Sequence, residues 1–217
     1  MIWTPETRAA RVDSILAQAP VLPVLAIEDC DDAVPLARAL VDAGLPVLEV
    51  TLRTPCALDA MRAIVNEVPG ALVGAGTMLR KEDFLAVEST GAVFGIAPGT
   101  TAALYEAAEL TALAFIPAVA TASELMLGME HGYRRFKFFP AEAAGGTVAL
   151  RAFAGPFADV RFCPTGGIDA AKAPAYLALK NVATVGGSWM VPPAQLAARD
   201  WDGIARLARE AASLRAG

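Results

Sequence analysis

The chain has 217 residues, 55% of them hydrophobic, so its length and composition suit one large globular domain with a sizeable core. A net charge of -5, with no lysine and arginine cluster beyond Arg134-Arg135, argues against nonspecific binding to nucleic acid and favours a small-molecule partner. Three widely spaced cysteines and a single histidine disfavour a disulfide framework and a zinc site, although carboxylates could still hold Mg²⁺.

The N-terminal segment, residues 1–19, mixes acidic and basic residues with apolar ones, which is unlike a secretory signal peptide. Long uncharged segments such as residues 181–198 are interrupted by glycine, proline and polar residues, so we expect no membrane-spanning helix. These features together predict a cytoplasmic protein.

Helical and strand-like segments alternate along the chain. Residues 5–19 are typical of an amphipathic helix, with Val12, Ile15 and Leu16 at helical spacing. The short apolar runs that follow lack alternation, which is typical of strands covered on both faces. We expect strands at residues 21–27, 46–52, 71–76, 92–96, 113–117, 136–139, 160–163 and 182–185. We expect helices at residues 33–43, 55–68, 81–90, 101–110, 123–131, 146–154, 170–179 and 202–214.

Strands separated by helices at intervals of roughly 25 residues predict an α/β fold of parallel βαβ units that close into a (β/α)8 TIM barrel. An open doubly wound sheet is the competing architecture. It is disfavoured because Gly74-x-Gly76 lacks the third glycine of a dinucleotide-binding fingerprint and follows the third strand instead of the first. No change of composition marks a boundary, so we expect one domain over residues 1–217. The extra N-terminal helix would cover the barrel's N-terminal end.

Lys137 lies in the most unusual stretch of the sequence, residues 135–140 (RFKFFP). A lysine on a strand is usually solvated or paired with a carboxylate, and that structural role is the alternative. Phenylalanines on both sides indicate a dry environment, in which an amine must be paired or lose its proton. Because a neutral amine in such a pocket is the nucleophile of Schiff-base chemistry, we predict that Lys137 forms an imine with a carbonyl substrate.

Glu49 lies inside the second apolar strand. Glu49, Thr51 and Arg53 alternate along the chain, so we expect their side chains to point to the same side, into the mouth of the barrel. A buried Glu-Arg pair of structural value is the alternative. A lysine in the opposite wall favours a functional role, because Schiff-base chemistry needs a positioned carboxylate to move protons.

Two glycine doublets follow the last two predicted strands. Gly166-Gly167 comes after residues 160–163, and Gly186-Gly187 with Ser188 comes after residues 182–185. Most Gly-Gly pairs are simple turns. Barrels often bind phosphate at these two positions, however, and glycine lets backbone N–H groups approach an anion, so the doublets favour a phosphorylated substrate.

Small or rigid residues end several other strands: Gly76-Thr77, Ala97-Pro98-Gly99 and Pro117. They fit either the lining of a compact pocket or ordinary turns. His131 lies at the expected end of a helix and is assigned no catalytic role, and Cys163 is expected near the site without a partner to activate it.

The sequence resembles the class I 2-keto-3-deoxy-6-phosphogluconate (KDPG) aldolases, a family that includes 4-hydroxy-2-oxoglutarate aldolases. The resemblance covers essentially the whole chain and is carried by residues 48–54 (LEVTLRT), 73–77 (VGAGT), 136–142 (FKFFPAE) and 161–168 (RFCPTGGI), together with 123–128 (SELMLG) and 186–189 (GGSW). Ala97, where serine is common in the family, and residues 118–121 (AVAT) depart from its pattern.

The resemblance implies a barrel with a lysine Schiff base, no metal or other cofactor, a homotrimeric assembly and a place in the Entner–Doudoroff pathway. Motif by motif, it implies imine formation by Lys137 and acid/base catalysis by Glu49. It further implies substrate binding by Arg53, Thr77, Pro98, Phe139 and Thr165, with Gly166, Gly167, Gly187 and Ser188 holding phosphate. The expected reaction is cleavage of KDPG to pyruvate and glyceraldehyde 3-phosphate.

Two other functions remain open. The same chemistry could act on 4-hydroxy-2-oxoglutarate or 2-keto-3-deoxy-6-phosphogalactonate, and the glycine doublets favour the phosphorylated substrates. A barrel that binds phosphosugars without catalysis is the other alternative, and it leaves Glu49 and Lys137 unexplained.

Overall fold

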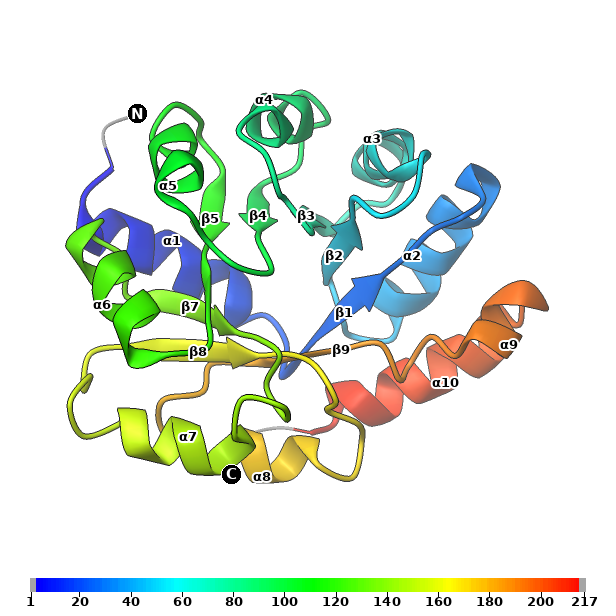
Figure 1. Cartoon of the computed structure of the whole chain (residues 1–217). Helices are drawn as coiled ribbons and strands as arrows, with labels where there is room; N and C mark the ends of the chain where they lie inside the picture. The colour runs from blue at the N-terminus through cyan, green and yellow to red at the C-terminus, as the bar shows by residue number, and fades with distance from the viewer. Residues whose placement is uncertain (1–2, 215–217) are drawn as a thin grey trace.

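The computed structural model describes residues 3–214, in which helices surround a set of parallel strands (Figure 1). The strands are β1 (Val21–Leu25), β2 (Val47–Thr51), β3 (Leu72–Gly76), β4 (Phe94–Ile96), β5 (Ala114–Ile116), β6 (Ala118–Val119), β7 (Arg135–Phe138), β8 (Arg161–Pro164) and β9 (Val185–Gly187). The helices are α1 (Pro5–Leu16), the 3-10 turn η1 (Cys30–Asp32), α2 (Ala33–Asp42), α3 (Ala57–Glu67), α4 (Glu82–Glu88), α5 (Ala102–Ala108), α6 (Ala122–Glu130), α7 (Gly146–Phe153), α8 (Ala173–Leu177), α9 (Pro193–Ala197) and α10 (Trp201–Ala212). The expected α/β class is confirmed.

Parallel pairing organises the strands. A six-stranded sheet has the order β5-β4-β3-β2-β1-β9, and a three-stranded sheet has the order β6-β7-β8. Isolated parallel bridges, Phe162 with Val182 and Thr165 with Gly186, connect β8 to the segment that contains β9. Pro117 alone separates β5 from β6, and its carbonyl accepts a 2.9 Å hydrogen bond from the Lys137 N–H.

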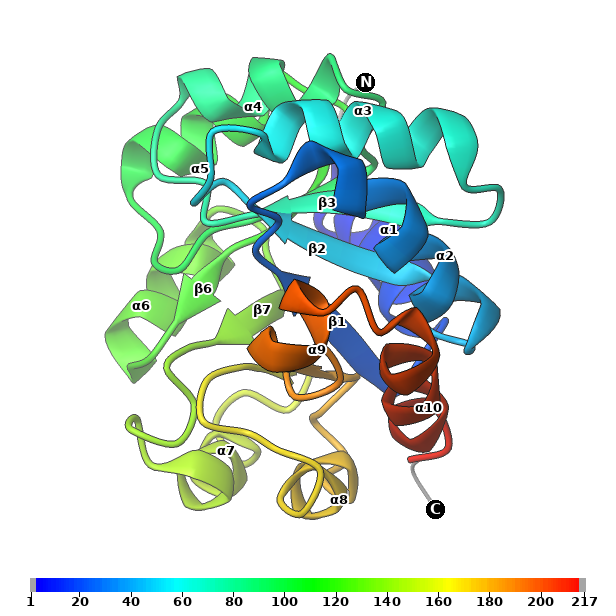
Figure 2. The ribbon, with the colours of Figure 1, turned by 90° about the vertical axis from the view of Figure 1, so that its right-hand side faces the viewer.

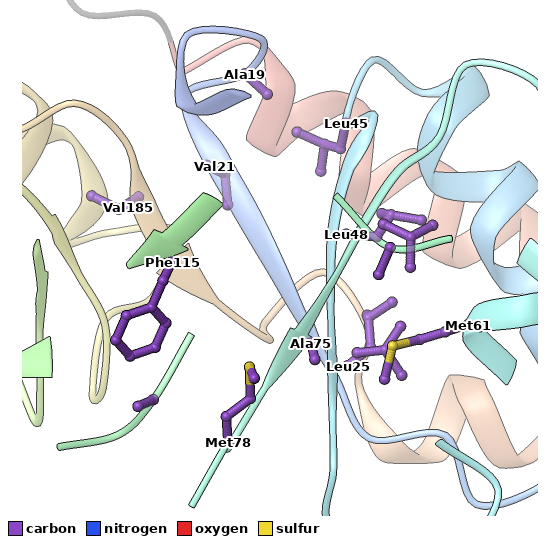
Figure 3. Packing of buried hydrophobic residues seen from close by; sticks show 14 of the residues in the cluster. Ala19, Val21, Leu25, Leu45, Leu48, Met61, Ala75, Met78, Phe115 and Val185 are labelled. Atoms are coloured by element: carbon purple, nitrogen blue, oxygen red, sulfur yellow. The ribbon is translucent and has the colours of Figure 1, made fainter. Parts of the chain in front are cut away.

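The strands are buried on both faces, as their continuous apolar runs predict. Along each strand, every second side chain packs outward against the helices. Figure 3 shows Leu25, Leu48 and Ala75 with Met61 of α3 in this outer layer. The side chains between them point inward, and Val47, Glu49 and Thr51 of β2 belong to this set.

Helix α1 packs against the inner apolar cluster. Val12, Ile15 and Leu16 share that cluster with strand side chains that include Leu22 and Phe94. The helix begins at Pro5 behind a capping box formed by Thr4. Two contacts across the chain help to hold it in place: Arg135 forms a salt bridge with Asp13, and Arg8 donates to the Tyr133 hydroxyl.

The C-terminal helices lie beside the first βα unit, where α10 contacts α2 on one side of β1 (Figure 2). The short helix α9 comes between β9 and α10, and the sequence did not predict it. Within residues 3–214, no helix is both long and apolar enough to cross a membrane.

The structure corrects several predicted boundaries, among them the first helix, which ends at Leu16 and not at residue 19. The last strand lies at Val185–Gly187 and not at residues 182–185, because Gly186 and Gly187 pair with Leu22 and Pro23 of β1. The fifth strand is divided by Pro117, which has no N–H to offer its neighbours. The helix expected at residues 170–179 spans only Ala173–Leu177. The ends of the expected domain, residues 1–2 and 215–217, lie outside the described residues.

Candidate active site

A buried ion pair links two strands at the centre of the molecule. Nζ of Lys137 on β7 donates a 2.9 Å hydrogen bond to Oε1 of Glu49 on β2. The lysine side chain is 6% exposed and the glutamate side chain 1%. A pair this well hidden from water carries a desolvation cost that surface pairs avoid, so it is weak evidence for stability and stronger evidence for a functional site.

The surroundings of Lys137 differ from the sequence expectation in one respect. Phe136 and Phe138 do not enclose the amine, because alternation along β7 sends both rings into the outer layer. Phe138, for example, packs edge-on against Phe162. The amine instead faces inward beside Cys163, its register partner on β8. Of the three phenylalanines at 136, 138 and 139, Phe139 is the one near the amine, with its ring centroid 5.5 Å from Nζ.

Glu49 fits because Gly76 on β3, the register partner of Thr51, has no side chain. A Cβ atom added to Gly76 would lie 2.2 Å from Oε1 of Glu49. Gly76 therefore leaves the space in which the carboxylate sits. The second oxygen, Oε2, is buried and accepts no hydrogen bond within residues 3–214. That oxygen is free to accept a proton from a bound ligand.

Thr51 and Arg53 continue the same side of β2, as predicted. The Thr51 hydroxyl donates to the carbonyl of Leu25 at 2.8 Å and accepts from Nε of Arg53 at 3.0 Å. Thr51 is buried, whereas Arg53 is exposed at the carboxyl end of the strand. Among the described residues, the guanidinium is held through Nε alone, so its terminal nitrogens can pair with an anionic group.

Thr77 and Pro98 lie just beyond the carboxyl ends of β3 and β4, at the same end of the sheet as Arg53. Thr77 has a positive φ of 61°, a conformation that costs free energy for a β-branched residue. Both residues are half-buried. Their expected role in lining a pocket for the substrate stays a prediction.

Thr165 follows β8 and is buried against β9. A Cβ atom added to Gly186 would lie 2.2 Å from Oγ1 of Thr165, so Gly186 is required by this close approach. Cys163, two residues earlier, is fully buried, and burial raises the pKa of its thiol to about 12. The thiol therefore stays protonated at neutral pH, which agrees with the expectation that it is not activated.

The loop at Gly166 and Gly167 presents backbone N–H groups. Both residues have positive φ angles, 106° and 76°. The Gly166 carbonyl accepts from the Glu142 N–H at 3.1 Å, and the Gly167 carbonyl accepts from Nζ of Lys172 at 2.8 Å. In a trans peptide the N–H of one residue points opposite to the carbonyl of the residue before it. The N–H groups of Gly167 and Ile168 therefore point away from Glu142 and Lys172, respectively. Neither donates to an acceptor in the described part of the chain.

The second doublet is not a loop. Gly186 and Gly187 are buried in β9, and a Cβ atom at Gly187 would lie 2.0 Å from the Trp189 ring. Ser188 follows the strand and is exposed. It lines a cavity of about 700 Å³ with Arg53, Trp189 and the end of β1. Lys137 and Glu49 do not border this cavity. The cavity therefore lies beside the buried ion pair and shares Arg53 with the candidate site.

The sequence did not predict why two glycines matter. Gly76 pairs with Thr51 in the parallel register and leaves room for Glu49, and Gly186 pairs with Thr165 and leaves room for its hydroxyl. Lys172 contacts the Gly167 loop, and no sequence pattern connects the two. Within residues 3–214, no group of three His, Cys, Asp or Glu side chains could hold a metal ion.

The chain is similar to known aldolases along nearly its whole length. A family model described as "Aldolase: KDPG and KHG aldolase" matches residues 12–207. The KHG/KDPG aldolase of Escherichia coli (strain K12) is 56% identical over 199 residues, which cover 92% of this chain and 93% of that protein. The 2-dehydro-3-deoxy-phosphogluconate aldolase of Zymomonas mobilis is 50% identical over 204 residues, which cover 94% of this chain and 96% of that protein.

Solved structures agree with these relatives. The KDPG aldolase of Legionella pneumophila, with pyruvate captured as a covalent carbinolamine intermediate, superimposes with a TM-score of 0.91 at 46% identity, covering 93% of this chain and 98% of that one. The KDPG aldolase of Zymomonas mobilis with 3-phosphoglycerate has a TM-score of 0.90 at 50% identity, covering 94% of this chain and 96% of that one. The resemblance seen in the sequence motifs is thereby confirmed, and the chain belongs to the KDPG and KHG aldolase family.

Proposed function

We propose that this chain is a class I aldolase that cleaves KDPG to pyruvate and glyceraldehyde 3-phosphate through a Schiff base on Lys137. The observation that carries the proposal is the 2.9 Å contact between the buried amine of Lys137 and the carboxylate of Glu49. The names of the relatives support the reaction, and the Legionella aldolase holds pyruvate covalently. A binding protein without catalysis leaves the buried contact between Glu49 and Lys137 unexplained.

We infer that the strands form one closed (β/α)8 barrel and that residues 1–217 are a single domain. The bridges between β8 and β9, and the single proline between β5 and β6, support closure of the two sheets into one ring. Helix α1 would cover the N-terminal end, since it packs on the inner cluster. The site residues would then lie at the opposite, carboxyl end, where barrels carry their active sites.

Activation of Lys137 begins with its proton. The hydrogen bond to Glu49 Oε1 gives that proton a direct path to the carboxylate, leaving a neutral amine and a protonated Glu49. The amine attacks the carbonyl carbon 2 of the substrate and forms a carbinolamine. Loss of water, with a proton supplied by Glu49, gives a protonated imine that withdraws electrons from carbon 3.

Carbon–carbon cleavage then needs a base. The Glu49 carboxylate, again ionised, accepts the proton of the carbon 4 hydroxyl, directly or through a bound water. The bond between carbons 3 and 4 breaks, its electron pair forms the enamine, and glyceraldehyde 3-phosphate leaves. Glu49 returns the proton to carbon 3, and hydrolysis of the imine releases pyruvate. The buried Oε2, which accepts no bond from residues 3–214, supports this second role.

We assign substrate recognition to the carboxyl ends of several strands. The Arg53 guanidinium, held by Thr51, is suited to pair with the keto acid carboxylate. Thr77 and Pro98 would line the pyruvate portion, and Phe139 would cover the imine. Thr165 would contact the substrate near the bond being cleaved. Gly166 and Gly167 would hold the phosphate through backbone N–H groups, with Ser188 and the end of β9 at Gly187 closing the same site.

The same chemistry on 4-hydroxy-2-oxoglutarate is the second candidate, because the matching family model includes KHG aldolases. A comparison of kcat/KM for the phosphorylated and unphosphorylated substrates decides between the two. The N–H groups of the Gly167 loop support the phosphorylated substrate.

Assembly and location remain proposals that the family resemblance implies. We propose a homotrimer, and exposed apolar side chains such as Leu110, at 81% exposure, and Val148, at 70%, support association of chains. We also propose that the protein works in the cytoplasm, because its relatives are metabolic aldolases. Light scattering after size-exclusion chromatography measures the number of chains.

One experiment tests the function directly. The protein is incubated with pyruvate and borohydride, which reduces an imine to a stable secondary amine, and mass spectrometry then locates the adduct. We expect one pyruvyl adduct on Lys137 and none in the Lys137→Ala variant. An adduct that persists in that variant, or no adduct on the wild-type chain, would refute the proposal.

A further inference from the structure

The Gly166-Gly167 loop is held by two kinds of donor. The carbonyls of Thr165 and Gly166 accept from the backbone N–H groups of Ala141 and Glu142, at 2.8 Å and 3.1 Å. The Gly167 carbonyl accepts from a side chain, Nζ of Lys172 at 2.8 Å. The peptide that links Gly167 to Ile168 is therefore the part of the loop whose orientation depends on a side chain.

Lys172 is itself anchored. Nζ lies 2.8 Å from Oε2 of Glu142, while Oε1 of Glu142 accepts from the Tyr176 hydroxyl. Lys172 and Tyr176 lower the pKa of the Glu142 carboxyl, and Glu142 raises the pKa of Lys172, so both groups are ionised at neutral pH. The Glu142 side chain also packs over the loop, since a Cβ atom at Gly167 would lie 2.8 Å from its Cγ.

We propose that Glu142, Lys172 and Tyr176 form a positioning unit that keeps the Ile168 N–H directed at the phosphate of the substrate. The proposal rests on the aldolase function proposed above. A trans peptide aims its N–H opposite to its carbonyl, so fixing the Gly167 carbonyl fixes the Ile168 N–H. A donor that is already oriented loses no freedom when the anion binds. The unit sets affinity for a phosphorylated substrate and takes no part in bond cleavage.

A purely electrostatic role for Lys172 predicts something different. Its charge is compensated by Glu142 at 2.8 Å, so the pair presents little net charge to a phosphate. If Lys172 acted by attraction alone, removing the Glu142 charge would strengthen phosphate binding. If the unit acts by position, the same change releases Lys172 and weakens binding. The two roles therefore give opposite signs for the Glu142→Met variant.

The test compares KM for KDPG with the pyruvate concentration that gives half-maximal borohydride trapping, because pyruvate carries no phosphate. In Lys172→Met we expect KM for KDPG to rise about tenfold, the worth of one hydrogen bond to a charged group, with kcat within twofold and pyruvate trapping unchanged. Glu142→Met and Tyr176→Phe should raise KM in the same direction. Lys172→Arg, which keeps a donor for the carbonyl, should restore KM to within about threefold of the wild-type value.

Lys180→Met is the matched control, because it removes an exposed lysine and should leave KM unchanged. Thermal unfolding of each variant separates a local effect from loss of fold, and Tyr176→Phe keeps the test valid if Lys172→Met is unstable. An unchanged KM in Lys172→Met, or a lower KM in Glu142→Met, overturns the positioning role. Failure of the wild-type chain to trap pyruvate overturns the proposed function as well.

Discussion

Glu49 and Lys137 share a 2.9 Å hydrogen bond although 88 positions separate them in the sequence. Each side chain lies on the inner face of its own strand, and neither strand pairs with the other. The contact therefore exists only because the strands curve around a common interior. An amine and a carboxylate that meet in this way can exchange a proton without any movement of the backbone.

The Glu49→Gln variant tests the carboxylate. An amide accepts no proton from Lys137 or from the substrate hydroxyl, so we expect turnover to fall about 10²–10⁴-fold with little change in thermal unfolding. Steady-state cleavage of KDPG and a melting curve measure the two quantities. Glu67→Gln, which removes an exposed carboxylate at the end of α3, is the control. Turnover close to the wild-type value would remove Glu49 from its proposed role.

The Gly76→Ala variant tests the space that Glu49 occupies. The new methyl group would lie 2.2 Å from Oε1, so the carboxylate that contacts Lys137 must move. A displacement of about 1 Å in a catalytic group can cost about 10²-fold in rate, and overpacking about 1–3 kcal/mol in stability. Kinetics and urea unfolding measure both. Gly155→Ala, whose Cβ would meet nothing within 4 Å, should change neither. Full activity in Gly76→Ala would contradict the geometry.

The Arg53→Lys variant tests carboxylate recognition. Lysine keeps the charge but loses the planar fork and the bond from Nε to the Thr51 hydroxyl. We expect the pyruvate concentration for half-maximal trapping to rise about tenfold, while the maximal rate of trapping changes less. Arg62→Lys, on an exposed face of α3, serves as the control. Equal pyruvate requirements in Arg53→Lys and the wild-type chain would assign the carboxylate to another residue.

Cys163 provides a pH-dependent test of burial. Its thiol pKa is raised to about 12 by burial, above an unfolded value of about 8.5. A raised pKa contributes stability that is complete below the unfolded pKa and declines as pH rises towards the folded pKa. Between about pH 9 and 11, the wild-type free energy of unfolding should fall by about 1.4 kcal/mol per pH unit more than that of Cys163→Ala. Urea unfolding at several pH values measures the difference, and parallel slopes would show that the thiol is not desolvated.

Much of the site could be predicted from local sequence. Alternation along residues 47–53 correctly placed Glu49, Thr51 and Arg53 on one side of β2. The glycines at 166 and 167 do adopt positive φ angles in a loop after β8. These properties depend on strand geometry and on glycine's freedom, which act over a few residues.

Other features were misread for physical reasons. The phenylalanines beside Lys137 suggested an enclosing apolar pocket, but the alternation of β7 turns Phe136 and Phe138 outward. The doublet Gly186-Gly187 resembled a loop, yet it lies in β9 because it pairs with Leu22 and Pro23, and Thr165 and Trp189 leave no room for side chains there. The outward direction of the phenylalanines follows from local alternation, whereas the pairing of the doublet depends on β1, a distant segment.

The sequence by itself determined the parallel α/β class and the family and singled out Glu49 and Lys137 as candidates, because periodicity, strand spacing and motifs are local properties of the chain. Only the tertiary structure decided that Lys137 lies 2.9 Å from Glu49, that Gly76 makes room for the carboxylate, and that Lys172 holds the Gly167 carbonyl. Those relations depend on the register of strands and on the packing of residues far apart in sequence, which no local pattern encodes.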